Sequence, residues 1–387
     1  MEDFSFGIGL KSNKESNDFL RCLWSRISHR FGKLAWLYSP LKVGNTIFVG
    51  QACISEEILL QVKLHYKQRG CLSTIDFDLR GYQDAGSLIN QLKLCIKEAL
   101  QYEKYLCENP FKALLDKNIS FKKKDGRKFC IDGNEIVFYV QGFDEVDLQS
   151  ICKVQMQQLC NFLTFDTLRY ITSAGTLTEE IRNNHNLRTS LVNADTGEKM
   201  GVDERNERYR NLVVSDWMAR CIDEYLERPY LYENHFSNFD KCIQLFAQAV
   251  RNEELSQIAI GLPEPYVEQA IVNYMSSLEV ITLNDREPEP CESCGQMRYS
   301  IARRVIDLAD STFPGRDNFA KDYYKDRSKY VHTGALFSSN NYINRTIPIM
   351  SISSRTGMID QIANVHNGLK ELVKECIIKH EHINCER

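Results

Sequence analysis

An arginine and a histidine near the end of the chain have the side chains best suited to chemistry on a phosphate group. In the stretch FAKDYYKDRSKYVHTGAL, the residues Phe319, Tyr323, Arg327 and Val331 recur every four positions, so they fall close to one stripe of an α-helix. A guanidinium cannot lose its charge, which makes Arg327 unusual on a stripe that faces a core. His332 follows five residues later. Arginine can donate to two phosphate oxygens at once, and histidine can give or take a proton near neutral pH.

The spacing of this pair does not by itself establish a site. Five residues rotate an ideal helix by about 140° beyond one full turn, so Arg327 and His332 do not share a face. They converge only if the arginine reaches back along the helix while the histidine lies at its frayed end. A structural alternative stays open, in which Arg327 pairs with a carboxylate such as Asp326 or Glu279 and His332 caps a helix.

Five amphipathic segments surround this pair in the C-terminal part of the chain. Apolar residues recur within them at the three- and four-residue spacing of a helix face. The segments are residues 238–252, 263–281, 295–310, the stretch from Phe319, and residues 358–378. Helices of this kind bury their apolar stripes against one another, which predicts an all-α bundle over residues 231–387.

The N-terminal part of the sequence mixes strand and helix patterns. Short runs rich in β-branched and aromatic residues predict strands, and longer amphipathic stretches predict helices. The strands are expected at residues 45–50 and 73–79, and the helices at residues 85–109 and 147–165. Residues 1–230 are therefore expected to form a mixed α/β domain.

A β-meander is predicted within that domain, at residues 119–142. Three strand-like runs are separated there by Asp125-Gly126 and Asp132-Gly133. Both dipeptides suit the positive φ angles of tight hairpin turns. The whole chain is therefore predicted to be α+β, with the meander in its N-terminal domain and the helical bundle at its C-terminus.

Composition limits the classes of protein that fit. Hydrophobic residues at 43% and charged residues at 26% of 387 residues indicate a globular protein of about two domains. No stretch reaches the roughly 18 apolar residues that cross a bilayer, and no basic-then-apolar leader is present, so a cytoplasmic protein without membrane contact is expected. The net charge of −4 argues against indiscriminate coating of nucleic acid. The 14 cysteines, without an export signal, predict reduced thiols.

The C-terminal segments resemble an HEPN domain of the Apea-like type, which occurs in prokaryotic antiviral and toxin proteins. The resemblance rests on the order CIQLFAQAV, EQAIVNYMSSLEVI, CGQMRYSIARRVIDLAD and YYKDRSKYVHTG, followed by a long amphipathic helix. Its most specific part is R-S-K-x-V-H. It covers residues 237–382, about two fifths of the chain. Thr333 is a mild departure, because the family often has glycine directly after the histidine.

The resemblance implies a bundle that dimerises, so that two Arg-x4-6-His motifs form one composite ribonuclease site that needs no metal or other cofactor. Arg327 and His332 would then be the catalytic residues. RNA cleavage by its own 2′-OH requires a proton to leave that hydroxyl, a proton to reach the 5′-oxygen, and charge to be stabilised on the phosphorane-like transition state. Histidine and arginine suit these tasks.

The biological role that the resemblance implies is antiphage defence, abortive infection or action as a toxin, through cleavage of RNA, including tRNA. Such an enzyme must be restrained by an antitoxin or released by a phage-derived trigger. Residues 1–230 would be the regulatory or sensor domain. The alternative is a non-catalytic HEPN module that serves dimerisation or RNA binding.

Neighbouring residues are candidates for supporting roles. Lys325, Lys329 and Tyr330 could contact RNA, although exposed lysines are usually only solvated and helical tyrosines usually pack in a core. Glu279 and Asp326 are acidic residues that could support the site. Glu279 also has a plain interpretation as a surface or ion-paired glutamate.

One metal site is also considered. Cys291 and Cys294 in CESC have the spacing of half a zinc site, and the nearest partners in the same domain are His382 and Cys385, with His380 beside them. The alternative is two free thiols in a loop. Sequence alone does not decide between them.

Overall fold

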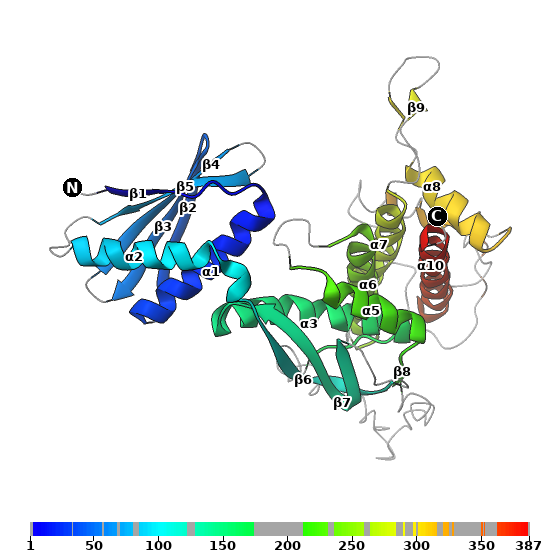
Figure 1. Ribbon diagram of the computed structural model, residues 1–387. Helices are drawn as coiled ribbons and strands as arrows, with labels where there is room; N and C mark the ends of the chain where they lie inside the picture. The colour runs from blue at the N-terminus through cyan, green and yellow to red at the C-terminus, as the bar shows by residue number, and fades with distance from the viewer. Residues whose placement is uncertain are drawn as a thin grey trace, which may run out of the picture. The chain divides into compact units, whose positions relative to one another are not determined.

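The structure is a computed structural model of the chain. It describes residues 3–32, 34–55, 58–67, 70–79, 85–121, 128–173, 212–230, 236–258, 264–283, 289–290, 297–298, 301–315, 320–324, 327–328, 350, 352 and 362–385. The chain forms two compact units (Figure 1). The first comprises Met1–Phe111, Tyr139–Val154 and Arg228–His235, and the second comprises Lys112–Phe138, Gln155–Glu227 and Phe236–Arg387. These units differ from the expected division into residues 1–230 and 231–387.

A five-stranded antiparallel sheet forms the centre of the first unit. Its strand order is β1-β5-β4-β3-β2. The strands are β1 (Asp3–Gly7), β2 (Ala35–Val43), β3 (Thr46–Ser55), β4 (Ile58–Lys67) and β5 (Cys71–Asp78). Strands β2 to β5 follow one another in the sheet as they do in the sequence, so they form a meander. The α+β class is thereby confirmed, together with both strands predicted in this region.

Two helices pack on one face of this sheet, α1 (Asn13–Phe31) and α2 (Ala85–Ala99). Alternate residues of the central strands, such as Val62 and Phe77, are fully buried beneath them. The buried residues that alternate along the strands and the apolar faces of the two helices therefore pack together in one core. The predicted helix at 85–109 is shorter than expected, because the chain turns through a 3-10 segment at Tyr102–Lys104 and continues as strand.

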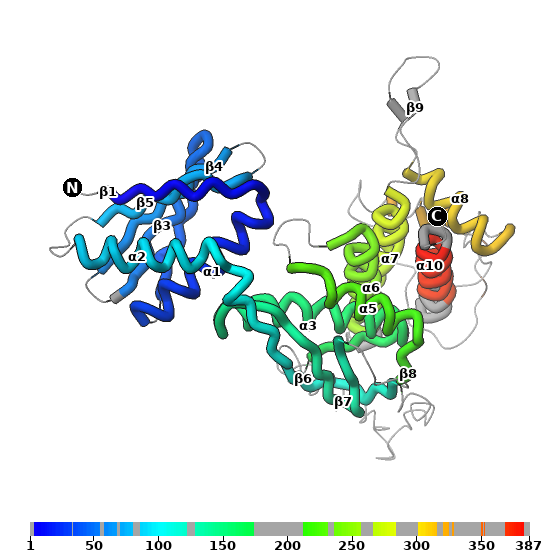
Figure 2. The backbone as a smooth tube through the Cα atoms, viewed as in Figure 1, coloured from blue at the N-terminus to red at the C-terminus, as the bar shows by residue number. Residues whose placement is uncertain are grey.

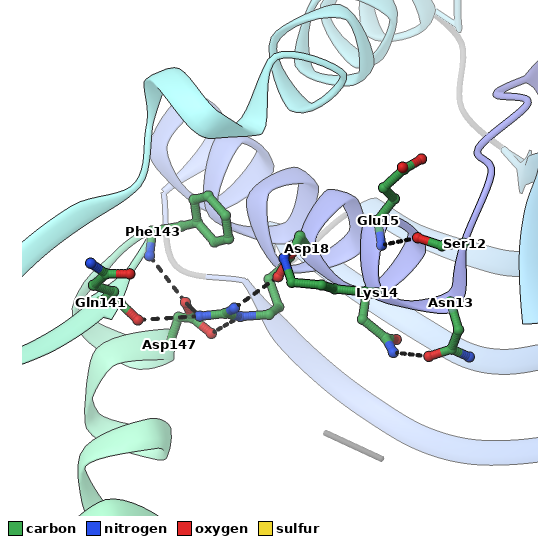
Figure 3. A network of polar contacts seen from close by, with 10 residues as sticks. Ser12, Asn13, Lys14, Glu15, Asp18, Gln141, Phe143 and Asp147 are labelled. Atoms are coloured by element: carbon green, nitrogen blue, oxygen red, sulfur yellow. Dashed lines mark hydrogen bonds and ion pairs between the residues drawn. The ribbon is translucent and has the colours of Figure 1, made fainter. Parts of the chain in front are cut away.

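A polar network fixes α1 to residues 141–147 of the same unit (Figure 3). Arg21 donates to both carboxylate oxygens of Asp147, over 2.9 Å and 2.7 Å, and to Asp18 over 3.1 Å. The guanidinium carbon also lies 5.0 Å from the ring centroid of Phe143. Asp147 accepts a further bond from the Phe143 amide. Arg21 therefore forms a bidentate ion pair with Asp147, and we assign it a structural role.

The predicted meander at residues 119–142 is wrong in its details. Residues Phe129–Gly142 form a single long strand, β7, which runs through Asp132-Gly133. Gly133 has a φ of 64°, so the dipeptide does adopt the left-handed conformation, but inside a strand rather than in a hairpin. The sheet order is β7-β6-β8, with β6 at Cys107–Ser120 and β8 at Leu212–Val213. Asp125-Gly126 lies outside the described residues.

The second unit is mainly helical (Figure 2), and its C-terminal region is helical as predicted. The long α3 spans Glu145–Thr167 and contributes its second half to this unit. The other named helices are α5 (Asp216–Glu227), α6 (Asn238–Ile258), α7 (Glu264–Ile281), α8 (Ile301–Thr312) and α10 (Ile362–Cys385). Residues 320–324 and 327–328 are also helical. Helix α8 begins later than predicted because Met297–Arg298 forms strand β10, which pairs with β9 (Glu289–Pro290).

A buried polar contact joins three of these helices. The Tyr274 hydroxyl of α7 donates to Glu253 of α6 over 2.7 Å, and Lys370 of α10 donates to the same carboxylate over 3.0 Å. Glu253 is 4% exposed and Tyr274 is fully buried. A carboxylate this deep is stable only because both of its oxygens are paired.

None of the described helices combines the length and the apolar character needed to span a bilayer.

Candidate functional site

Arg327 follows two buried residues of a helical segment. Ala320 and Tyr323 are each 1% exposed, so this face packs into the core of the second unit. One turn later, the Arg327 side chain keeps 24% of its surface exposed. Of the stripe that the sequence predicts, Tyr323 is therefore buried and Arg327 reaches solvent. Phe319, Val331 and His332 lie outside the described residues.

A carboxylate from α7 holds the guanidinium. Arg327 Nη2 donates to Glu279 Oε2 over 2.6 Å, and the Glu279 side chain is 15% exposed. Glu279 lies in the last turn of α7, where the helix carries partial negative charge and has no basic residue of its own. A lone carboxylate is unfavourable there, so the positive charge of Arg327 offsets both the glutamate and the helix end. The pairing considered from the sequence, Arg327 with Glu279, is present.

Tyr324 lies beside this ion pair. Its ring centroid is 5.9 Å from the guanidinium carbon of Arg327. Burial, followed by the charge and hydrogen bonding of Glu279, raises the pKa of Tyr324 to about 12, against the opposing effect of Arg327 and Arg304. The phenol therefore stays protonated throughout the physiological pH range and acts as a neutral hydrogen-bond donor.

Arg304 of α8 is a second cation at the end of α7, and the sequence analysis did not single it out. Its Nη1 donates to the carbonyl oxygen of Leu283 over 2.8 Å, directly after the last turn of α7. A signal was available in the sequence. Arg304 follows Ile301 by three residues and precedes Leu308 by four, so it lies on the inward side of α8, whereas the neighbouring Arg303 side chain is 66% exposed.

Three polar atoms of this cluster are buried and have no hydrogen-bond partner among the described residues. They are Oε1 of Glu279, Nε of Arg327 and Nε of Arg304. A buried polar atom left unpaired costs about 1–3 kcal/mol. The hydrogen-bonding capacity of these atoms remains for groups outside the described residues or for a ligand.

The other residues predicted at this site are not described. Lys325, Asp326, Lys329 and Tyr330 lie outside the described residues, as does His332. The convergence of Arg327 with His332 stays a prediction. The structure brings together Arg327 and Glu279, and adds Tyr324 and Arg304 to them.

The predicted zinc ligands are described only in part. Cys291 and Cys294 fall between β9 and β10, outside the described residues, and the side chain of Cys385 is likewise not described. The ring of His382 lies 5.9 Å from that of Trp217, an aromatic packing contact. Within the described part of the chain, no three histidine, cysteine or acidic side chains are placed to hold a metal. The zinc site stays a prediction.

A polar line crosses the sheet of the first unit on the face away from its helices. His65 Nε2 lies 2.5 Å from Asp76 Oδ2, and His65 Nδ1 lies 2.9 Å from Thr46 Oγ1. The three residues come from β4, β5 and β3. The sequence analysis missed them because they are far apart in the chain. Cross-strand pairs of this kind stabilise a sheet, and we assign the line that structural role.

Searches of protein-family models, curated proteins and solved structures return no match for this chain. The site is therefore interpreted from its own geometry and from the motif resemblance.

Proposed function

We propose that this chain is a metal-independent endoribonuclease of the HEPN type, whose catalytic residues are Arg327 and His332. The observation that carries the proposal is the setting of Arg327. It follows the buried Tyr323 by four residues, keeps 24% of its side-chain surface exposed, and is held by Glu279 in the last turn of α7. A guanidinium oriented in this way suits a phosphate group.

The chemistry assigns one task to each side chain. The 2′-oxygen attacks the adjacent phosphorus, the bond from phosphorus to the 5′-oxygen breaks, and a 2′,3′-cyclic phosphate forms. In the proposed homodimer, one His332 takes the proton from the 2′-OH and the other gives a proton to the departing 5′-oxygen. Arg327 stabilises the charge that develops on the non-bridging oxygens.

Uncontrolled RNA cleavage would harm the cell that makes the protein, so the ribonuclease activity must be regulated. We place the control in the N-terminal part of the chain, which we propose to sense an infection-derived trigger or to bind an antitoxin. RNA, including tRNA, would be the substrate, and host defence or toxicity would be the outcome. The proposed location is the cytoplasm.

A second candidate function is a non-catalytic module for dimerisation or RNA binding. It is favoured by the same ion pair, because a short bond to Glu279 is also what a purely structural arginine would make.

Cleavage of total cellular RNA separates the two functions. We expect the wild-type protein to cleave in the presence of EDTA and to leave 2′,3′-cyclic phosphate ends, and His332→Ala and Arg327→Ala to be inactive. His29→Ala, at an exposed position on α1, is the matched control and should cleave like wild type. Analysis of product ends by enzymatic end-labelling gives the measurement.

Two results would contradict the proposal. One is an activity that disappears in EDTA and returns with Mg²⁺, because the chemistry described requires no metal. The other is cleavage by His332→Ala at the wild-type rate. If Arg327→Ala lost its helical circular dichroism, the structural role of Arg327 would be favoured instead.

A further inference from the structure

Arg304 lies where it can extend the proposed site. Both arginines attach to the same end of α7, Arg327 through the side chain of Glu279 and Arg304 through the carbonyl of Leu283. Glu279 lies in the last turn of α7, and Leu283 follows the end of the helix by two residues. A hydrogen bond from the Leu283 amide to the Val280 carbonyl holds the chain in a tight turn directly after α7.

The charge of Arg304 is not balanced in this cluster. Arg327 forms an ion pair with Glu279, whereas the bond from Arg304 goes to a neutral carbonyl. Within the part of the chain that the structure describes, Arg304 forms no ion pair. Two guanidinium groups and one carboxylate leave a net charge of about +1, which favours an anion at this helix end.

Tyr324 lies beside Arg327, with its ring centroid 5.9 Å from the guanidinium carbon. Both arginines lower the pKa of its phenol, so both act on the same hydroxyl. Because that pKa still lies at about 12, the hydroxyl keeps its proton. The cluster thus places two charged donors beside a neutral phenol that is hydrogen-bonded to Glu279, and the two guanidinium groups suit the oxygens of a phosphodiester.

We infer that Arg304 is a phosphate-binding residue of the RNA site, where it takes a backbone phosphate of the substrate strand together with Arg327. The inference rests on the proposed ribonuclease function and extends it to a residue outside the Arg-x4-6-His motif. Glu279 is then a positioning residue, because it orients Arg327 without contacting the RNA.

The test uses binding rather than cleavage. The probe is a short single-stranded 2′-O-methyl RNA, which binds through its phosphates but lacks the hydroxyl that attacks. Its affinity for the full chain is measured by fluorescence anisotropy over a series of salt concentrations. The variants are Arg304→Gln and, as the matched control, Arg303→Gln. Both lose one positive charge from adjacent positions of α8, but Arg303 is the exposed one.

The expected result distinguishes a contact from a general charge effect. Loss of one phosphate contact to a single strand reduces the slope of log K against log salt by about 0.7. We expect that reduction, and about tenfold weaker binding, for Arg304→Gln. Arg303→Gln should keep the wild-type slope. Arg304→Lys retains the positive charge and should recover most of the wild-type slope. That recovery would show that the effect of Arg304→Gln comes from the lost charge and not from a folding defect.

The remaining outcomes separate this inference from the proposed function. Equal slopes for wild type and Arg304→Gln, with normal cleavage of unmodified RNA by both, would overturn the inference and leave the ribonuclease proposal intact. A reduced slope in Arg304→Gln, with no cleavage by any variant, would support phosphate binding and reject the chemistry. No binding of the probe by wild type would overturn the inference outright.

Discussion

At the scale of single residues, Arg327 illustrates how a charge can be held on an otherwise apolar stripe. Its guanidinium is neither fully buried nor free, and Glu279 fixes its direction through a 2.6 Å bond. A charge-assisted hydrogen bond of this kind is worth about 1.5–3 kcal/mol when it is shielded from water. The bond therefore stabilises the fold and, in our proposal, aligns the group that meets the phosphate.

The strength of this pair can be measured by a double-mutant cycle. We expect Glu279→Gln and Arg327→Gln each to lower the free energy of unfolding, because each leaves a partly buried charge without its partner. The double variant should cost less than the sum, with a coupling energy of about 1–3 kcal/mol. Equilibrium unfolding in urea gives the three values. A coupling near zero would mean that the ion pair is screened by water and does not position Arg327.

At the scale of elements, the end of α7 and the middle of the helical unit use polar groups in different ways. Near the end of α7, the charged side chains of Glu279 and Arg327 are partly exposed and have hydrogen-bonding atoms without a partner among the described residues. In the middle, Glu253, Tyr274 and Lys370 pair with one another and tie α6, α7 and α10 together. The first arrangement suits ligand binding and the second suits stability.

The buried triad predicts a large effect from a single substitution. Lys370→Met leaves the Glu253 carboxylate buried with one partner, and we expect a loss of about 3–5 kcal/mol in the free energy of unfolding. Adding Glu253→Gln to Lys370→Met should restore part of the lost free energy of unfolding, because the uncompensated charge is removed. Lys241→Met, at an exposed position of α6, is the control and should change little. A loss below about 1 kcal/mol in Lys370→Met would show that Glu253 is hydrated.

At the scale of the whole molecule, the chain combines a sheet-based unit with a mainly helical one. We propose that the helical unit supplies the ribonuclease site and that the N-terminal part controls it. The proposed site needs two copies of the chain, because each Arg-x4-6-His motif contributes only one histidine.

This requirement makes activity depend on concentration. We expect the cleavage rate per chain to fall on dilution, in parallel with the fraction of dimer measured by analytical ultracentrifugation. Mixed dimers of wild type and His332→Ala should lose activity, because the proposed chemistry assigns a separate proton transfer to each of the two histidines. A rate per chain that stays constant after the dimer has dissociated would refute the composite site.

The sequence by itself determined the α+β class, the approximate helix positions of the C-terminal part, and the anomaly at Arg327. Local periodicity is sufficient for these features, since a 3.6-residue stripe marks a helix wherever it packs. The anomaly was visible because a permanent charge interrupts that stripe.

Only the tertiary structure decided where the meander lies, which carboxylate Arg327 meets, and that Arg304 shares the end of α7. The meander is formed by β2 to β5, whereas Asp132-Gly133 lies inside the long strand β7. The dipeptide misled the prediction because it can be accommodated within a strand as well as in a turn. Glu279 and Arg327 are 48 residues apart in the chain. Contacts over such separations depend on how the elements pack, and local sequence patterns carry no record of that packing.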